Sequence, residues 1–169
     1  VKAGGMAFGM LPETAADITK KVKAISKRPV MVKLSPNAPD LVAVARACEN
    51  AGADALSLVN TFLGMAIDVQ KKRAVFENVY AGLSGPAILP IALRMVHQVA
   101  HAVQIPVVGM GGIASAEDAL KFLMAGAVAV QVGTMTFANP NAMLAIIDGL
   151  ADYCKSEGLQ NLQEIVGII

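Results

Sequence analysis

Two pairs of small residues in the second half of the chain have the types and spacing needed to hold a phosphate group. The pair Gly111–Gly112 follows an apolar run at 105–108, and the pair Gly133–Thr134 follows another at 127–132. Glycine lets a backbone approach a ligand closely, and free N–H groups can donate to an anion. In a (β/α)8 barrel the loops after the last two strands commonly form such a site. The sequence therefore predicts that two successive strand-end loops bind the phosphate of a mononucleotide.

The segment Gly109–Ala114 also matches the G-x-G-x-x-G/A pattern of dinucleotide-binding domains. That function needs an acidic residue about 20 positions further on, at the end of the next strand, to bind a ribose. The corresponding segment, Val128–Thr134, contains no acidic residue. The pattern therefore favours a mononucleotide phosphate over a dinucleotide.

Lys33 is a cation within an apolar run, Val30–Leu34, that has the character of a strand. Lysine is rarely buried without a partner. Its side chain either reaches solvent at the end of a barrel strand or extends into the barrel mouth. In the second case it would hold a flavin ring or stabilise an anion that develops during a reaction.

Two further segments are candidates for ligand contacts. Asn60 and Thr61 follow the apolar run at 55–59, so we expect them at the carboxyl edge of the sheet, where barrel active sites lie. Asparagine is also a common turn residue, so position alone leaves both roles open. The segment Gly82–Pro86 is either a simple Gly/Pro turn or a stretch of backbone N–H groups that meets a ligand at a helix start.

Alternating strand and helix patterns must position these residues. Strands are predicted at 30–34, 55–59, 105–108 and 127–132. Helices are predicted at 12–26, 39–50, from 86 or 90 to 103, and at 116–125, 139–156 and 161–166, with Asn139 as an N-cap and Ser115 and Asp118 as a capping box. Residues 62–85 have weak strand signals and are longer than an ordinary connection, so they are predicted to be a functional loop.

This order predicts an α/β fold with a parallel sheet, because a helix lies in each crossover. Four parallel strands cannot close a barrel. The fold is therefore either an open doubly wound sheet or about four strands from the C-terminal half of a (β/α)8 barrel. The chain begins at Val1 without an initiator methionine, which favours the second interpretation.

Composition excludes several other classes. Hydrophobic residues make up 55% of the chain, which suits a parallel sheet covered by helices. The formal charge of +1 argues against a nucleic-acid-binding surface or a polybasic membrane surface. There is no run of 18 apolar residues and no signal-peptide pattern, so a cytoplasmic location is expected. Cys48 and Cys154 are expected to be free thiols. His97 and His101 are expected to lie on a solvated helix face and not to bind a metal.

Several motifs in one order carry a resemblance to a known family. They are VKLSPN at 32–37, VNT at 59–61, GLSGPA at 82–87, PIALRMV at 90–96, VVGMGGI at 107–113 and AGAVAVQVGT at 125–134, after the leading VKAGGMAFG. The chain resembles the catalytic subunit of dihydroorotate dehydrogenases, most closely the NAD-linked class 1B. Residues 1–169 would form the C-terminal part of a single FMN-binding barrel domain.

The resemblance implies a flavin enzyme that oxidises (S)-dihydroorotate to orotate in de novo pyrimidine (UMP) biosynthesis. It implies FMN contacts at Lys33, Val59, Gly85, Gly111, Gly112, Gly133 and Thr134, and contacts with the pyrimidine at Asn60 and Thr61. It also implies a homodimer of catalytic subunits within a heterotetramer. The partner subunit would carry FAD and an iron–sulfur cluster and pass electrons to NAD.

The chain departs from the family pattern at a few places. The family's catalytic cysteine belongs to an Asn-x-Ser-Cys-Pro-Asn segment that precedes the VK motif and is absent here, so no catalytic residue is assigned and this chain alone is expected to be inactive. Tyr80-Ala81-Gly82 stands where the family more often has paired glycines, and Leu89 stands where a lysine is usual.

Four alternatives remain open at this point. One is a dihydropyrimidine dehydrogenase-like subunit that reduces uracil or thymine, and another is a one-subunit dihydroorotate dehydrogenase linked to fumarate. A third is a non-redox barrel enzyme that binds a substrate phosphate at Gly111–Gly112 and Gly133–Thr134. The fourth is a truncated, non-catalytic chain.

Overall fold

A four-stranded parallel sheet forms the centre of the computed structural model, which describes residues 8–169. Its strands lie in the order β1 (Met31–Lys33), β2 (Ala55–Leu58), β7 (Val107–Met110) and β8 (Ala129–Gln131). The order in the sheet follows the order along the chain with no reversal, as in a barrel, whereas a doubly wound sheet reverses at a switch point. The predicted parallel sheet is confirmed, and its order favours the barrel interpretation over the doubly wound one.

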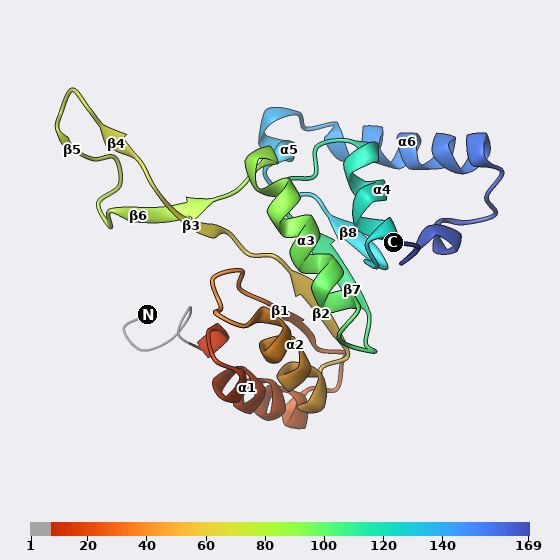
Figure 1. Cartoon of the computed structure of the whole chain (residues 1–169), viewed down its shortest axis with the longest axis horizontal. Coiled ribbons are helices and arrows are strands. Elements are labelled where there is room, and N and C mark those ends of the chain that lie inside the picture. The colour runs from red at the N-terminus through yellow and green to blue at the C-terminus, as the bar shows by residue number, and fades with distance from the viewer. Residues whose placement is uncertain (1–7) are drawn as a thin grey trace.

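Helices alternate with the strands of the sheet along the chain and pack around it (Figure 1). They are α1 (Pro12–Ile25), α2 (Leu41–Asn50), the 3-10 turn η2 (Pro86–Ile88), α3 (Leu89–Ala100), α4 (Ala116–Met124), α5 (Met135–Ala138), α6 (Ala142–Glu157) and the 3-10 turn η3 (Leu162–Ile165). The side chain of Asp40 accepts a hydrogen bond from the N–H of Ala43 and so fixes the start of α2.

The core lies between the sheet and these helices. Leu56 and Leu58 of β2 are fully buried, as are Val96 of α3 and Phe122 of α4. Gly109 lies inside β7, where a Cβ atom would come within 2.6 Å of the Phe122 ring. This glycine therefore allows close packing of α4 on the sheet rather than an approach to a ligand.

The segment predicted to be a long loop is instead a β-ribbon. Strands β3 (Phe62–Met65) and β6 (Tyr80–Leu83) pair antiparallel, and β4 (Ile67–Asp68) pairs with β5 (Arg73–Ala74) beyond them. Figure 1 shows this ribbon projecting away from the body of the molecule. The loop prediction was wrong because the ribbon exposes large apolar side chains. Its sequence therefore lacks the alternation of apolar and polar residues that marks a half-buried strand.

The N-cap predicted for the helix at 139–156 was also wrong. Helix α6 begins at Ala142 with Asn141 as its N-cap, and the Asn139 side chain instead accepts from the N–H of Asn141. The short helix α5, which was not predicted, ends just before this turn. The Ser115 side chain accepts from the N–H of Asp118, as in a capping box. The Asp118 carboxylate, however, accepts from the N–H of Ala114 and not from that of Ser115, so the returning bond reaches one residue further back.

The cysteines are free, as predicted: Cys48 is buried and Cys154 is half-buried. Burial raises the pKa of the Cys48 thiol, so it stays protonated near neutral pH. The rings of His97 and His101 lie 4.2 Å apart, and residues 8–169 contain no cluster of three or more metal-ligand side chains. Within the same residues, no helix is both long and apolar enough to span a membrane.

Candidate functional site

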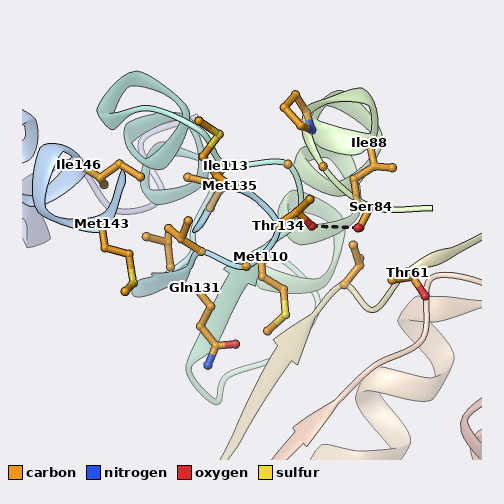
Figure 2. Close-up of a pocket in the computed structure, with 18 of the residues that line it drawn as sticks. Thr61, Ser84, Ile88, Met110, Ile113, Gln131, Thr134, Met135, Met143 and Ile146 are labelled. Carbon is orange, nitrogen blue, oxygen red and sulfur yellow. Dashed lines mark hydrogen bonds between the residues drawn. The ribbon is translucent and has the colours of Figure 1, made fainter. Parts of the chain in front are cut away.

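A pocket of about 710 Å³ opens at the carboxyl edge of the four-stranded sheet. It is bounded by the ends of all four strands, by the root of the β-ribbon and by α6 (Figure 2). All the residues that the sequence assigned to a site line this pocket: Lys33, Val59, Asn60, Thr61, Gly85, Gly111, Gly112, Gly133 and Thr134. The parallel sheet brings these distant residues together because its strands all end at one edge.

The register of the sheet determines which side chains of the other strands share a face with Lys33. Lys33 pairs with Ser57, Ser57 pairs with Val108, and Val108 pairs with Ala129. Paired residues of parallel strands point to the same face, so these side chains form one layer. Lys33 is exposed, and it also lines a smaller neighbouring pocket of about 360 Å³. Its ammonium group is therefore available to a ligand at the strand ends.

The turn after β7 requires glycine for reasons of packing as well as access. Gly111 and Gly112 have φ angles of 130° and 81°, which side chains rarely allow. A Cβ atom on Gly111 would lie 2.7 Å from Ala92, and one on Gly112 would lie 2.8 Å from Leu89 and 2.9 Å from the carbonyl oxygen of Gly85. These glycines thus hold the turn tightly against the start of α3.

The turn after β8 is open by comparison. A Cβ atom on Gly133 would meet nothing within 4 Å, so this backbone borders free space. Within residues 8–169, the N–H groups of Gly112, Gly133 and Thr134 donate no hydrogen bond to a backbone or side-chain acceptor. Unpaired N–H groups beside a pocket are suited to bind an anion.

The lining of this pocket fits FMN, the cofactor that the sequence resemblance implies. A phosphate oxygen only accepts hydrogen bonds, and the loops offer free N–H groups together with the hydroxyl groups of Ser84 and Thr134. Apolar side chains of α6, Met143 and Ile146, lie across the pocket from Ser84 and Thr134 (Figure 2). Met110, Ile113 and Met135 add further apolar lining. Polar donors on one side and an apolar wall on the other fit a ligand that joins a phosphate to a ring system.

Asn37 holds the segment that carries Asn60 and Thr61. Its amide nitrogen donates to the carbonyl oxygen of Thr61 at 3.1 Å, and its amide oxygen accepts from the N–H of Leu63 at 3.1 Å. The side-chain oxygen of Asn60 accepts from the N–H of Thr61 at 2.8 Å. The sequence analysis missed this role because Ser35-Pro36-Asn37 has the composition of an ordinary turn.

The β-ribbon also shapes this part of the pocket. A Cβ atom on Gly82, in β6, would collide with the side chain of Thr61. Gly82 is the last residue of the Tyr80-Ala81-Gly82 stretch, in which the chain departs from the family pattern. The stretch therefore retains Gly82, which the Thr61 side chain requires for space.

Fold and site together define an α/β protein of the barrel type with a pocket at the carboxyl edge of its sheet. Comparisons with known proteins identify the family within this class. The family model for dihydroorotate dehydrogenase matches residues 1–154. The chain belongs to the dihydroorotate dehydrogenase family.

Curated relatives agree with that assignment. The chain is 53% identical over 169 residues to the dihydroorotate dehydrogenase B (NAD(+)) catalytic subunit of Petrotoga mobilis, covering 100% of this chain and 56% of the relative. It is 56% identical over 167 residues to the protein of the same name in Desulforamulus reducens, covering 99% and 55%. The predicted resemblance to the NAD-linked class is confirmed. The chain spans about half the length of the curated relatives it matches.

A solved structure supports the fold. The crystal structure of a dihydroorotate dehydrogenase from Eimeria tenella, in complex with ferulenol, superposes with a TM-score of 0.78 at 22% identity. The match covers 94% of this chain and 49% of the other. The predicted fold class, four parallel strands with helices from a (β/α)8 barrel, is confirmed.

Proposed function

We propose that the full-length protein oxidises (S)-dihydroorotate to orotate with FMN, in de novo pyrimidine (UMP) biosynthesis, and that residues 1–169 form the C-terminal part of its single barrel domain. The observation that carries the proposal is the convergence of Lys33, Asn60–Thr61 and the two strand-end loops on one pocket. The fold by itself does not require the cation of Lys33, the polar pair Asn60–Thr61 and unpaired N–H groups to meet at one edge of the sheet.

In this proposal the two strand-end loops hold the cofactor. The N–H groups of Gly112, Gly133 and Thr134 would bind the FMN phosphate, and Gly85 and Val59, which also line the pocket, would contact the cofactor. When bound, FMN would supply the acceptor for the hydride that leaves C6 of dihydroorotate as a proton leaves C5. The base that takes this proton is the family's cysteine, which lies outside this chain. The residues described here therefore bind and orient rather than move the proton.

Lys33 and the Asn60–Thr61 pair have separate roles in this proposal, the first toward the flavin ring and the second toward the substrate. The ammonium group of Lys33 would favour negative charge on a bound ring, because an opposite charge nearby lowers the energy of an anion. Asn60 and Thr61 offer both donors and acceptors, which the polar edge of a pyrimidine requires. Asn37 keeps their segment in place through its two hydrogen bonds.

We further propose that electrons leave through a partner subunit that carries FAD and an iron–sulfur cluster and reduces NAD. The support is the B (NAD(+)) catalytic-subunit name of the relatives at 53–56% identity. Two copies of the catalytic subunit would pair within a heterotetramer, and a cytoplasmic location follows for an enzyme of this kind. No nucleic acid takes part.

Flavin analysis of the purified full-length protein tests the proposal. We expect FMN to be released on denaturation, and anaerobic (S)-dihydroorotate to bleach the bound flavin. A protein that binds no flavin would contradict the proposal and favour a non-redox barrel enzyme. Bleaching by dihydrouracil but not by dihydroorotate would favour the dihydropyrimidine dehydrogenase-like alternative, and turnover with fumarate without a partner would contradict the proposed electron path.

A further inference from the structure

The side chain of Asn37 continues the parallel sheet beyond the end of β1. Backbone pairing beside β1 reaches as far as the bond from the Asn60 N–H to the Leu34 carbonyl oxygen, at 3.2 Å. The chain then turns away from the sheet, and the Asn37 amide donates to the Thr61 carbonyl oxygen and accepts from the Leu63 N–H, each at 3.1 Å. A strand residue in a parallel ladder bonds in the same way to two residues of its neighbour that lie two positions apart. The amide of Asn37 therefore takes the place of one strand residue.

The two partners determine the orientation of this amide. A backbone carbonyl oxygen only accepts and a backbone N–H only donates, so the Asn37 nitrogen faces Thr61 and its oxygen faces Leu63. Ser35 supports the same residue, because its Oγ atom accepts from the backbone N–H of Asn37 at 3.3 Å. Asn37 is half-buried and lines neither of the two pockets described at the strand ends within residues 8–169. Its effect on a ligand must therefore pass through the segment that it holds.

These bonds occupy the backbone of Thr61 and leave polar side-chain groups free. The Thr61 carbonyl oxygen accepts from Asn37, and the Thr61 N–H donates to the side-chain oxygen of Asn60 at 2.8 Å. Within residues 8–169, the side-chain nitrogen of Asn60 and the hydroxyl group of Thr61 have no hydrogen-bond partner, and both residues line the pocket. Gly82 of β6 packs against the Thr61 side chain, since a Cβ atom there would collide with it. Protein contacts thus hold the pair in place while two of its polar groups remain available to a ligand.

We infer that Asn37 is a positioning residue for the substrate, which sets the affinity for dihydroorotate and orotate through Asn60 and Thr61 without touching either molecule. This inference rests on the proposed function and deepens it. It also separates two parts of the site, because the turns that would hold the FMN phosphate follow β7 and β8 and make no hydrogen bond to Asn37 within residues 8–169. Loss of the Asn37 amide should therefore affect the substrate and spare the flavin.

Orotate binding to the FMN-loaded full-length protein tests this inference, with the shift in flavin absorbance as the signal. Asn37→Ala removes both bonds and should weaken orotate binding by about 10- to 100-fold, because small displacements of groups that orient a substrate have effects of this size. The kcat/KM for dihydroorotate should fall by a similar factor. The affinity of the apoprotein for FMN should stay within about twofold of wild type, as for a separate site that shares no partner.

Asn37→Asp has nearly the same shape, so it tests the hydrogen bonds themselves and serves if the alanine variant folds poorly. A charged carboxylate accepts from Leu63 but cannot donate to Thr61, so orotate should bind weakly near neutral pH. A protonated carboxyl group can do both, so orotate affinity relative to wild type should recover as the pH falls through the pKa of the introduced group. As a control, Asn50→Ala removes an exposed amide at the end of α2 and should bind orotate as the wild type does.

A double-mutant cycle shows whether Asn37 acts through the pair. Residues that act as one unit have effects that do not add. Once Asn60→Ala and Thr61→Ala have removed the two polar side chains, Asn37→Ala should therefore cause little further loss of kcat/KM for dihydroorotate.

The outcomes separate this inference from the proposed function. If Asn37→Ala binds orotate as tightly as the wild type, the inference is wrong and the proposed function stands. If Asn37→Ala weakens FMN and orotate binding equally, or if its loss of kcat/KM adds to that of the pair, Asn37 is a general structural support and the inference is again wrong. If the wild-type protein binds FMN but not orotate, the proposed function itself fails.

Discussion

Replacement of Lys33 by alanine tests the chemistry of the site most sharply. Lys33 is the last residue of β1, pairs with Ser57 in the sheet and lines both pockets at the strand ends. No salt bridge joins it to a carboxylate within residues 8–169, so a protein partner does not neutralise its charge there. The charge is therefore free to act on a bound ring.

We expect Lys33→Ala to slow flavin reduction more than it weakens dihydroorotate binding. The ammonium group matters most when the ring gains negative charge, so its loss raises the transition state more than the ground state. One positioned donor to a developing anion is worth about 3 to 4 kcal/mol, or on the order of a hundredfold or more in rate. Stopped-flow mixing of the full-length protein with dihydroorotate under anaerobic conditions measures the rate directly.

Two control variants show whether the charge is responsible. Lys33→Arg keeps a cation and should retain more of the rate than Lys33→Ala. Lys155→Ala removes an exposed lysine that pairs with Asp152 on α6, far from β1 in the chain, and should reduce at the wild-type rate. If Lys33→Ala keeps its flavin and also reduces at the wild-type rate, Lys33 is only a structural or solvent-facing lysine and the reasoning is refuted.

Three other variants have distinct expected results. Gly133→Ala places a methyl group in open space beside the predicted phosphate, so FMN affinity should fall about tenfold or more while the melting temperature stays near wild type; unchanged affinity would place the phosphate elsewhere. Gly112→Val should instead destabilise the fold by about 2 to 5 kcal/mol in denaturant unfolding, because its Cβ would collide with the start of α3 at a left-handed φ; wild-type stability would contradict this packing. Asp54→Asn should lower the melting temperature at neutral pH. The hydrogen bond from Lys23, and then the bond from the Val30 N–H, hold the Asp54 pKa below its usual value. The stability that the charged carboxylate adds is therefore present above about pH 4 and disappears as the pH falls through the lowered pKa. Equal acid sensitivity of the variant and the wild type would argue against this role.

The sheet and the glycine loops could be predicted from sequence because their signals are local. A buried parallel strand is a short apolar run, and the residues that follow it lie at a known edge of the sheet. That rule placed Lys33, Asn60 and Gly111 together without any knowledge of the three-dimensional contacts. The ribbon at 62–83 lacked such a signal, since its apolar side chains face solvent and its strands are stabilised by pairing with each other.

The contacts that complete the site are long-range and leave no local pattern. The bond between Ser84 and Thr134 spans 50 residues, and the bond from Asn37 to Thr61 spans 24. Serine and asparagine in turns are common, so their types alone do not reveal these partners. The reason for glycine at position 112 was equally hidden, because the neighbour that excludes a side chain there is Leu89 at the start of α3.

The position of the FMN phosphate in an experimental structure of the full-length protein tests the central claim most directly. The account predicts phosphate oxygens within about 3 Å of the N–H groups of Gly112 and Thr134, at the ends of β7 and β8. A flavin whose phosphate lies away from both loops, or a structure in which these N–H groups face a substrate phosphate with no flavin present, would contradict it.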